Sequence, residues 1–287
     1  MKFKFLNVVL TGLILTVSGL ANATIINSTA DYTIDLQGSL PGAQMAMAYD
    51  PIRDLYYGAQ GGAPSFPGTV WDGNGNVVQT AALGADARAF NYNENTGNLE
   101  LVTFTSDNLI VGRNGSGLFN GTFTTLLNNM AGATSSQSML TYNSNADVFY
   151  SMSNSGVVNV VSHNDGTLLG DITLDFSTAG ITSFNNYFVG YDSTENVLIA
   201  TTLTTASIFE LDGSFLGNST IGSSARDGYY QGYTNGQLFI QDTSNGTFKG
   251  YDLFADGPTN SVPEPSTLAI FALGMIGLAS RRFKKQS

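Results

Sequence analysis

Few residues of this 287-residue chain have the types and spacings that chemistry requires. There is no cysteine, so disulfides, thiol chemistry and lipid attachment at cysteine are excluded. The single histidine, His163, cannot form a multi-histidine metal site. No serine-centred elbow, zinc motif or phosphate loop is recognisable, although two of the acidic residues could still serve a glycosidase. The sequence therefore favours a binding or structural protein, and a glycan-active hydrolase or lyase is the alternative.

One stretch looks like the start of a calcium loop. Asp72-Gly-Asn74-Gly-Asn76 supplies oxygen ligands, but Leu83 stands where a bidentate glutamate is required. A glycine turn between two strands explains the stretch better. We therefore expect no cofactor, with calcium as the alternative.

The charge of the chain limits its partners. The two ends, described below, contain six of the 11 basic residues and one of the 22 acidic residues. The remaining body has five basic and 21 acidic residues, a net charge of −16. Such a body should repel nucleic acid and anionic lipid. Cations, cationic partners and neutral glycans are the compatible ligands.

The body is built from repeats. The tyrosines at positions 49, 92, 142, 191 and 233 are separated by 43, 50, 49 and 42 residues, and a polar turn and an alternating apolar run follow each. This is a strand–turn–strand pattern. Between the tyrosines, Asn-Gly or Asp-Gly turns at 74–75, 114–115, 165–166 and 212–213 predict a second hairpin, because both turn residues accept a positive φ. Four antiparallel strands per unit without helices predict the blades of a β-propeller.

The fifth unit lacks its fourth strand, since the proline-containing segment after residue 257 cannot pair in a sheet. Tyr32–Leu40 precedes the first tyrosine as Asn76–Leu83 precedes the second, so it can supply that strand and close the ring. This closure resembles that of β-propeller proteins in general. We expect an all-β protein with one propeller of about five four-stranded blades over residues 24–257. Six blades are the alternative if the interval from Asn114 to Tyr142 hides a strand, and an open solenoid is a weaker one.

Polar residues recur in the joining loops, which connect the fourth strand of one unit to the first strand of the next. Propellers usually bind ligands at this end, and amides beside paired Arg and Asp suit glycan hydroxyls. The candidate ligand-binding residues are Gln44, Asp86, Arg88, Gln137, Asn185, Asn186, Arg226 and Asp227. A solvated rim with local Arg–Asp pairing is the alternative. The repeat tyrosines are expected to pack between blades rather than to stack on carbohydrate.

The N-terminus has the organisation of a secretory signal peptide. Lys2 and Lys4 precede the apolar stretch Phe5–Leu20, and Ala21-Asn22-Ala23 forms an A-x-A cleavage site. We expect residues 1–23 to be removed and the mature chain to start at Thr24, with a retained N-terminal anchor as the alternative.

The C-terminal tail combines three features. Val262-Pro263-Glu264-Pro265 leads into an uncharged stretch, Pro265–Ser280, which is followed by Arg281, Arg282, Lys284 and Lys285. A helix over this stretch would be about 24 Å long, shorter than the roughly 30 Å hydrocarbon core, so spanning needs local thinning or snorkelling of the basic side chains. The basic cluster should stay cytoplasmic and the body outside. The prolines stop the helix and leave an accessible segment next to the membrane.

This tail resembles the PEP-CTERM sorting signal of bacterial envelope proteins. The resemblance covers residues 258–287 and implies recognition by an exosortase, a membrane-embedded transpeptidase that cuts near the Pro-Glu-Pro motif. A plain C-terminal anchor is the alternative. We expect a Gram-negative envelope protein that is held transiently in the inner membrane as a precursor and then reaches the cell surface or the extracellular matrix. There it would act as a non-enzymatic binding or structural module, with exopolysaccharide as a possible partner and nucleic acid excluded.

Overall fold

The computed structural model describes residues 26–38, 44–62, 65–153, 155–182, 184–185, 187–222, 229–242 and 247–254, and of Gln44 and Ala46 only the backbone. These residues form 20 β-strands and no helix, and so contain no helical segment that could cross a membrane. The predicted signal peptide with Ala21 and Ala23 and the predicted sorting segment over 258–287 lie outside the described residues. The domain boundaries drawn from the sequence stay predictions.

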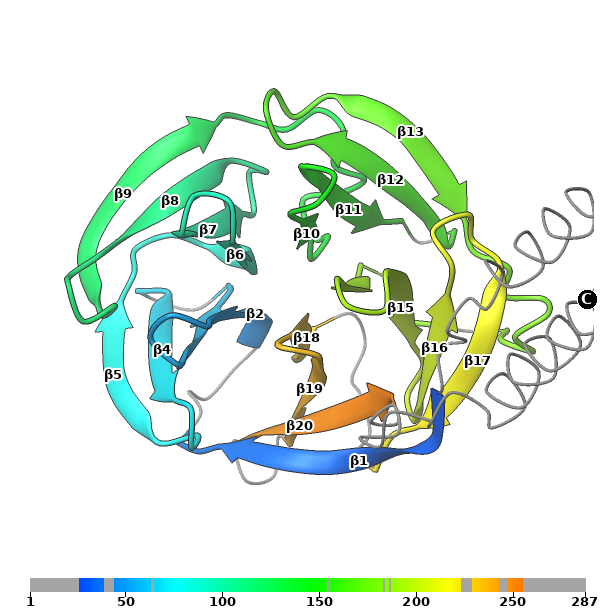
Figure 1. Cartoon of the computed structure of the whole chain (residues 1–287). Helices are drawn as coiled ribbons and strands as arrows, with labels where there is room; N and C mark the ends of the chain where they lie inside the picture. Colours follow the sequence, from blue (N-terminus) through cyan, green and yellow to red (C-terminus); the bar gives the residue numbers. More distant parts are fainter. Residues whose placement is uncertain are drawn as a thin grey trace, which may run out of the picture.

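The strands form five four-stranded antiparallel blades around a central axis (Figure 1). The innermost strands are β2 (Gln44–Asp50), β6 (Ala87–Asn93), β10 (Thr141–Asn143), β14 (Gly190–Asp192) and β18 (Gln231–Thr234). The second strands are β3 (Leu55–Gln60), β7 (Asn98–Thr103), β11 (Val148–Met152), β15 (Val197–Thr201) and β19 (Gln237–Asp242).

The outer half of each blade is more exposed. The third strands are β4 (Pro67–Asp72), β8 (Asn108–Arg113), β12 (Val157–Ser162), β16 (Thr205–Phe209) and β20 (Thr247–Phe254). The outermost strands are β5 (Val77–Ala82), β9 (Phe119–Leu127), β13 (Leu168–Thr173), β17 (Phe215–Thr220) and β1 (Ile26–Leu36). Every residue of β3 is buried, whereas β5 alternates between exposed and half-buried residues. The hydrophobic core therefore lies between the inner halves of neighbouring blades.

The predicted propeller with five blades is confirmed. The interval from Asn114 to Tyr142 contains β9 and an isolated bridge between Met139 and Phe188, and no sixth blade. A single parallel bridge, Thr29 to Thr220, joins the outermost strands of the fourth and fifth blades.

The N-terminal strand closes the ring as predicted. β1 runs antiparallel to β20, with Tyr32 opposite Tyr251 and Leu36 opposite Phe248. It begins at Ile26, six residues earlier than the pattern suggested. The buried Trp71 of the first blade donates a hydrogen bond from Nε1 to the carbonyl oxygen of Gln37, 2.7 Å away. The first and last blades are thereby fastened to each other through the strand that completes the fifth.

The turn after each innermost strand has a local chemical cause. In four blades the residue after the repeat tyrosine is Asp or Asn, and its Oδ1 accepts two backbone N–H groups of the turn, an Asx-turn. These residues are Asp50, Asn93, Asn143 and Asp192. In three blades the tyrosine hydroxyl also donates to the residue five positions on, which has a positive φ; the pairs are Tyr49–Asp54, Tyr142–Asp147 and Tyr191–Asn196.

The glycines of the second hairpin are required by close packing as well as by turn geometry. Gly75 has a φ of 83°, and a Cβ there would collide with the carbonyl oxygen of Asp35 in β1. Gly213 has a φ of 89° and stands in the same relation to Thr173 of β13. Only glycine combines a positive φ with such a close approach to a neighbouring backbone. The turn of one blade thus rests on the outermost strand of the blade before it.

Candidate functional site

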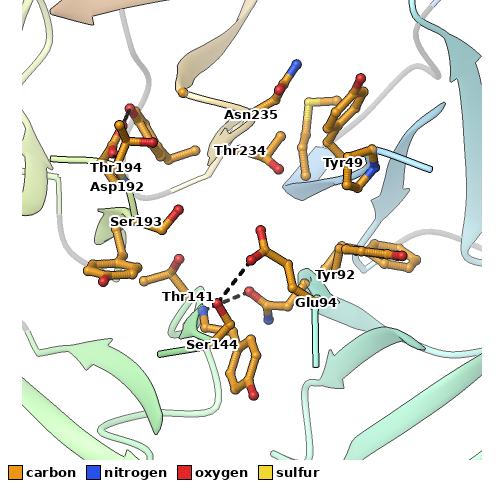
Figure 2. Close-up of a pocket in the computed structure, with 18 residues that line it drawn as sticks. Tyr49, Tyr92, Glu94, Thr141, Ser144, Asp192, Ser193, Thr194, Thr234 and Asn235 are labelled. Carbon is orange, nitrogen blue, oxygen red and sulfur yellow. Dashed lines mark hydrogen bonds between the residues drawn. The ribbon is translucent and has the colours of Figure 1, made fainter. Parts of the chain in front are cut away.

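A cavity with a volume of about 370 Å³ lies on the propeller axis. Its mouth is formed by the turns that follow the innermost strands, where Pro51, Glu94, Ser144, Ser193 and Asn235 each stand two residues after a repeat tyrosine (Figure 2). The fivefold repeat therefore places one turn residue from every blade around a common space. We call this space the axial cavity.

Hydroxyl and amide groups dominate the polar part of its wall. Thr141, Ser144, Ser193, Thr234 and Asn235 face the space from three blades (Figure 2). All five repeat tyrosines also line it, but in three blades their hydroxyls are bonded to the turns. Tyr191 packs against Tyr150 of the neighbouring blade with ring centroids 5.5 Å apart. These tyrosines thus support the wall, while the serine, threonine and asparagine side chains face the cavity.

Two carboxylates line the axial cavity, and they differ in their surroundings. Asp192 is 3% exposed; its Oδ1 accepts the backbone N–H groups of Thr194 and Glu195, and its Oδ2 accepts the hydroxyl of Tyr233. Burial, the charge of Asp192 and this hydrogen bond raise the pKa of Tyr233 well above its ordinary value. Glu94 is exposed and accepts a hydrogen bond from Ser144 Oγ at 3.3 Å. Asp192 therefore holds the wall together, and Glu94 is the carboxylate open to a ligand.

The space along the propeller axis becomes narrower below the axial cavity. A further space of only about 10 Å³ follows, lined mainly by apolar residues that include Met47, Phe90, Leu140 and Phe188. That is about the volume of one water-sized sphere. Asn91 spans this level, because its Nδ2 donates to the carbonyl oxygen of Leu140 at 3.2 Å and its Oδ1 accepts the N–H of Tyr142 at 3.1 Å. The described residues thus give the axial cavity a nearly closed floor.

The joining loops, where the sequence placed the ligand, lie at the opposite end of the innermost strands. There the structure brings together Asp86, Arg88 and Gln137. The guanidinium of Arg88 bonds to both oxygens of Asp86, to the carbonyl oxygen of Ala87 and to Oε1 of Gln137, which also accepts the hydroxyl of Tyr229. Arg88 is 5% exposed and lies 4.7 Å from the ring centroid of Phe104. Its donors are largely used within the protein.

Among the other predicted residues of these loops, Asn185 is described by the structure and makes its side-chain contacts elsewhere. Asn185 is buried and donates from Nδ2 to Thr201 Oγ1 at 3.0 Å, and Thr201 in turn donates to Gln231 at 2.7 Å. This chain of hydrogen bonds links the fourth and fifth blades. Asn186, Arg226, Asp227 and the side chain of Gln44 lie outside the described residues.

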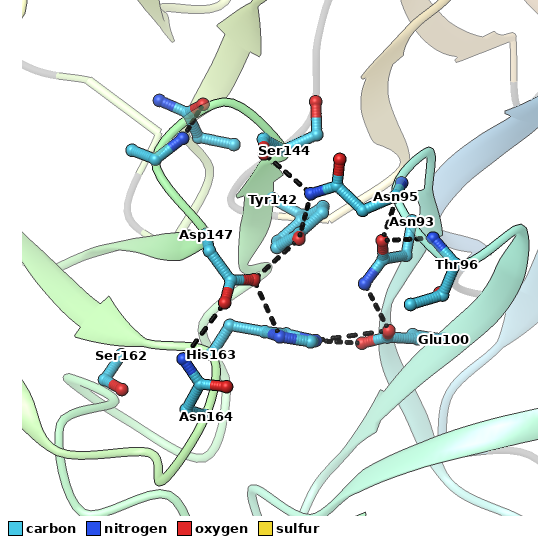
Figure 3. Close-up of polar contacts among 12 residues, drawn as sticks. Asn93, Asn95, Thr96, Glu100, Tyr142, Ser144, Asp147, Ser162, His163 and Asn164 are labelled. Atoms are coloured by element: carbon cyan, nitrogen blue, oxygen red, sulfur yellow. Dashed lines mark hydrogen bonds and ion pairs between the residues drawn. The ribbon is translucent and has the colours of Figure 1, made fainter.

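A second titratable cluster joins the second and third blades (Figure 3). His163 lies between two carboxylates: its Nε2 is 2.9 Å from Oε2 of Glu100 and its Nδ1 is 2.9 Å from Oδ1 of Asp147. Glu100 is 1% exposed and also accepts hydrogen bonds from Asn93 at 2.9 Å and Asn108 at 2.7 Å. His163 and Glu100 therefore form a hydrogen-bonded pair between blades that is ionic when His163 is protonated, here called the histidine clamp.

The pKa values of the histidine clamp follow from these contacts. Burial alone would lower the pKa of His163, but the hydrogen bond and charge of Glu100, with those of Asp147, outweigh it and raise the pKa above 6.5. Burial alone would raise the pKa of Glu100, but its bonds to His163 and Asn108 outweigh it and lower the pKa below 4.5. Each partner thus favours the charged form of the other.

No group of three or more His, Asp or Glu among the described residues is placed to hold a metal ion. In the calcium-like stretch, Oδ1 of Asp72 accepts the backbone N–H groups of Asn74 and Asn76 at 3.0 and 2.9 Å. These hydrogen bonds, that of Asn76 foremost, lower the pKa of Asp72. The carboxylate is used to shape the turn of the first blade.

Sequence reasoning did not single out the five turn residues at the mouth of the axial cavity, although a signal for them existed. They occupy the second position after each repeat tyrosine. A single serine or glutamate in a polar turn cannot be distinguished from any other turn residue. Aligning the turns by their tyrosines and comparing that position across the five units would have pointed to the mouth.

The tail and the body of the chain resemble different known proteins. Residues 261–285 match the family model described as the PEP-CTERM protein-sorting motif. This motif implies an exported, membrane-anchored precursor that an exosortase processes and that is sorted to the surface. No curated protein sequence matches the chain.

Solved structures resemble the body. Glutaminyl cyclase of Myxococcus xanthus has a TM-score of 0.55 at 11% identity, over 81% of this chain and 100% of that one. The tail fiber of Staphylococcus aureus phage P68 has a TM-score of 0.51 at 11% identity, over 86% of this chain and 57% of that one. A gluconolactonase of Xanthomonas campestris, XC5397, has a TM-score of 0.49 at 10% identity, over 82% of this chain and 96% of that one. At such identities a likeness concerns the fold alone.

Fold and tail together define the class of protein. The body is a five-bladed β-propeller closed by its N-terminal strand. The chain that contains it carries a PEP-CTERM sorting motif.

Proposed function

We propose that the exported propeller is a non-enzymatic surface or extracellular-matrix protein that binds glycan, such as exopolysaccharide, in the axial cavity. The observation that carries this proposal is the composition of the wall: hydroxyls and amides from three blades converge on one space, backed by aromatic residues. A volume of about 370 Å³ falls within the range of about 300–1,000 Å³ that small-molecule sites occupy. Hydroxyl and amide groups both donate and accept hydrogen bonds, as sugar hydroxyls do.

The affinity of one such site should be modest. Solvent-exposed hydrogen bonds each contribute little, so we expect dissociation constants between about 1 mM and 1 μM, or about −4 to −8 kcal/mol. A polymer offers many copies of the same sugar, and several propellers bound along it would gain avidity. Sorting to the surface, which the tail implies, would place the propellers where such a polymer lies.

Binding is favoured over glycan hydrolysis by the state of the two carboxylates. Hydrolysis requires one carboxyl as acid and a second as base or nucleophile. Asp192 is buried and committed to the turn and to Tyr233, which leaves Glu94 alone. The predicted rim of Asp86, Arg88 and Gln137 remains a second contact surface under this proposal. It ranks below the axial cavity because Arg88 is bonded within the protein.

The test is retention of the exported protein on exopolysaccharide from the producing organism. Ser193→Trp places a large side chain in the axial cavity, and Ser116→Trp adds the same side chain in an exposed turn outside it. We expect the Ser193 variant to be lost from the polymer and the Ser116 variant to be retained like wild type. Equal retention of both variants would refute the axial site. Release of shortened saccharide by the wild-type protein would refute the non-enzymatic role.

A further inference from the structure

The charge of the axial cavity is unbalanced. Among its described lining residues the charged side chains are Glu94 and Asp192, and no Lys, Arg or His is among them. Arg53 and Arg113, on the first and second blades, are both bonded to the buried Asp50, at 2.8 and 2.6 Å, and Asp50 does not line the cavity. No described basic residue therefore neutralises the cavity from within.

The two carboxylates differ in what they can offer a ligand. Both oxygens of Asp192 already accept hydrogen bonds. Glu94 extends toward the middle of the cavity (Figure 2). Ser144 donates to its Oε2, and no described residue donates to its Oε1. A carboxylate with a free oxygen inside a concave, partly shielded space is a strong acceptor for a charged donor.

The groups around Glu94 indicate which kind of cation its carboxylate could bind. A bare metal ion is usually held by several charged ligands, and the described residues contain no group of three or more His, Asp or Glu that could hold one. The groups around Glu94 are hydroxyls and amides, among them Ser193, Thr141 and Asn235. They match a molecule whose positive group sits among hydroxyls. An amino sugar has this arrangement, because its primary ammonium is attached to a ring that carries hydroxyl groups.

We propose that Glu94 makes the axial cavity selective for glycans that contain a free, protonated amino sugar over their N-acetylated or neutral counterparts. The inference rests on the proposed glycan binding and specifies its ligand. The ammonium donates to Oε1 of Glu94, while the neighbouring sugar hydroxyls exchange hydrogen bonds with the serine, threonine and asparagine side chains of the wall. N-acetylation removes the positive charge, so an acetylated sugar keeps the hydroxyl contacts and loses the ionic one.

The experiment is a calorimetric titration of the exported protein with a glucosamine trimer and an N-acetylglucosamine trimer, at a mildly acidic pH that keeps the amine protonated. Glu94→Gln removes the charge and keeps the shape. Glu195→Gln is the matched control, because it removes the same charge from a turn at the same end of the propeller, outside the cavity lining. Spermidine, which has amines and no hydroxyls, tests whether the amine alone is enough.

We expect wild type and Glu195→Gln to bind the glucosamine trimer about tenfold more tightly than the acetylated trimer, the effect of about one charge-assisted hydrogen bond. Glu94→Gln should lose that preference and leave binding of the acetylated trimer unchanged. Equal binding of the glucosamine trimer by both variants would overturn the inference, as would spermidine binding as tightly as the trimer.

The two proposals fail in different ways. If both trimers bind equally to wild type and to Glu94→Gln, the selectivity is wrong and glycan binding stands. If neither trimer binds, the selectivity is again wrong, and retention of the Ser193→Trp and Ser116→Trp variants on exopolysaccharide decides the proposed function by itself.

Discussion

The histidine clamp should contribute several kcal/mol to the stability of the propeller. Replacing His163 with Ala removes the partner of Glu100, a carboxylate 1% exposed that keeps only the amides of Asn93 and Asn108. Removing one member of a buried ion pair costs about 3–5 kcal/mol, because the other charge stays buried without its partner. The imidazole also packs between Tyr142 and Phe149, with ring centroids 4.9 and 5.3 Å away. At about 2–4 °C per kcal/mol for a domain of this size, a loss of about 4 kcal/mol lowers Tm by about 8–16 °C.

The pH dependence gives this prediction its sharpest form. Because the pKa of folded His163 is raised, its contribution is complete below about pH 6.5 and is lost as the pH rises through the folded-state pKa. Because the pKa of folded Glu100 is lowered, its contribution is complete above about pH 4.5 and is lost as the pH falls through the folded-state pKa. The difference in stability between wild type and His163→Ala should thus be largest between about pH 4.5 and 6.5.

The assay is thermal and urea unfolding of both proteins at pH 5.5 and pH 9, followed by circular dichroism. Lys249→Gln is the control, since it breaks the more exposed pair of Lys249 with Asp242 at 3.0 Å, for which we expect about 1 kcal/mol or less. A His163→Ala protein that melts within about 1 °C of wild type at pH 5.5 would refute the clamp. So would a stability difference that is the same at both pH values.

Three further predictions concern the tail, the closure and a turn. Replacing both Pro263 and Pro265 with Ala should leave an uncut, membrane-held protein, since the extended segment in front of the apolar stretch would be lost. Normal maturation of this variant, seen by intact mass of the exported protein, would contradict the sorting interpretation. Deleting residues 24–40 removes β1, exposes the edge of β20 and should cost several kcal/mol and promote association; an unchanged Tm in a monomeric truncated protein would contradict ring closure. Gly75→Ala should lower the free energy of unfolding in urea more than Gly84→Ala does, because both residues have a positive φ but only the Cβ at position 75 meets a neighbouring backbone, that of Asp35. Equal losses of stability would show that backbone strain alone accounts for both.

Much of the fold could be predicted from the sequence because each repeat depends on interactions between residues that are close to one another in the chain. The Asx-turn after four of the five tyrosines and the glycine in the second hairpin depend on residues within five positions of each other. Such short-range patterns can be recognised in the sequence without knowledge of the tertiary structure. The closing strand followed from counting, because a blade with three strands leaves an unpaired edge.

The site was harder to predict for the opposite reason. A propeller has loops at both ends, and which end has free polar groups depends on contacts between distant residues. Arg88 looked like a ligand-binding residue, but Gln137, which is 49 positions away, helps to hold it inside the protein. His163 and Glu100 are 63 positions apart, and nothing local to either predicts their pairing. Glu94 and Ser193 are ordinary turn residues until five blades bring the turns together.

The most direct test of the whole account is a crystal structure of the exported protein grown with the glucosamine trimer. We expect sugar density in the axial cavity, within hydrogen-bonding distance of Glu94 and Ser193. Density at the cluster of Arg88 and Gln137, or on the outermost strands with the axial cavity empty of sugar, would contradict it.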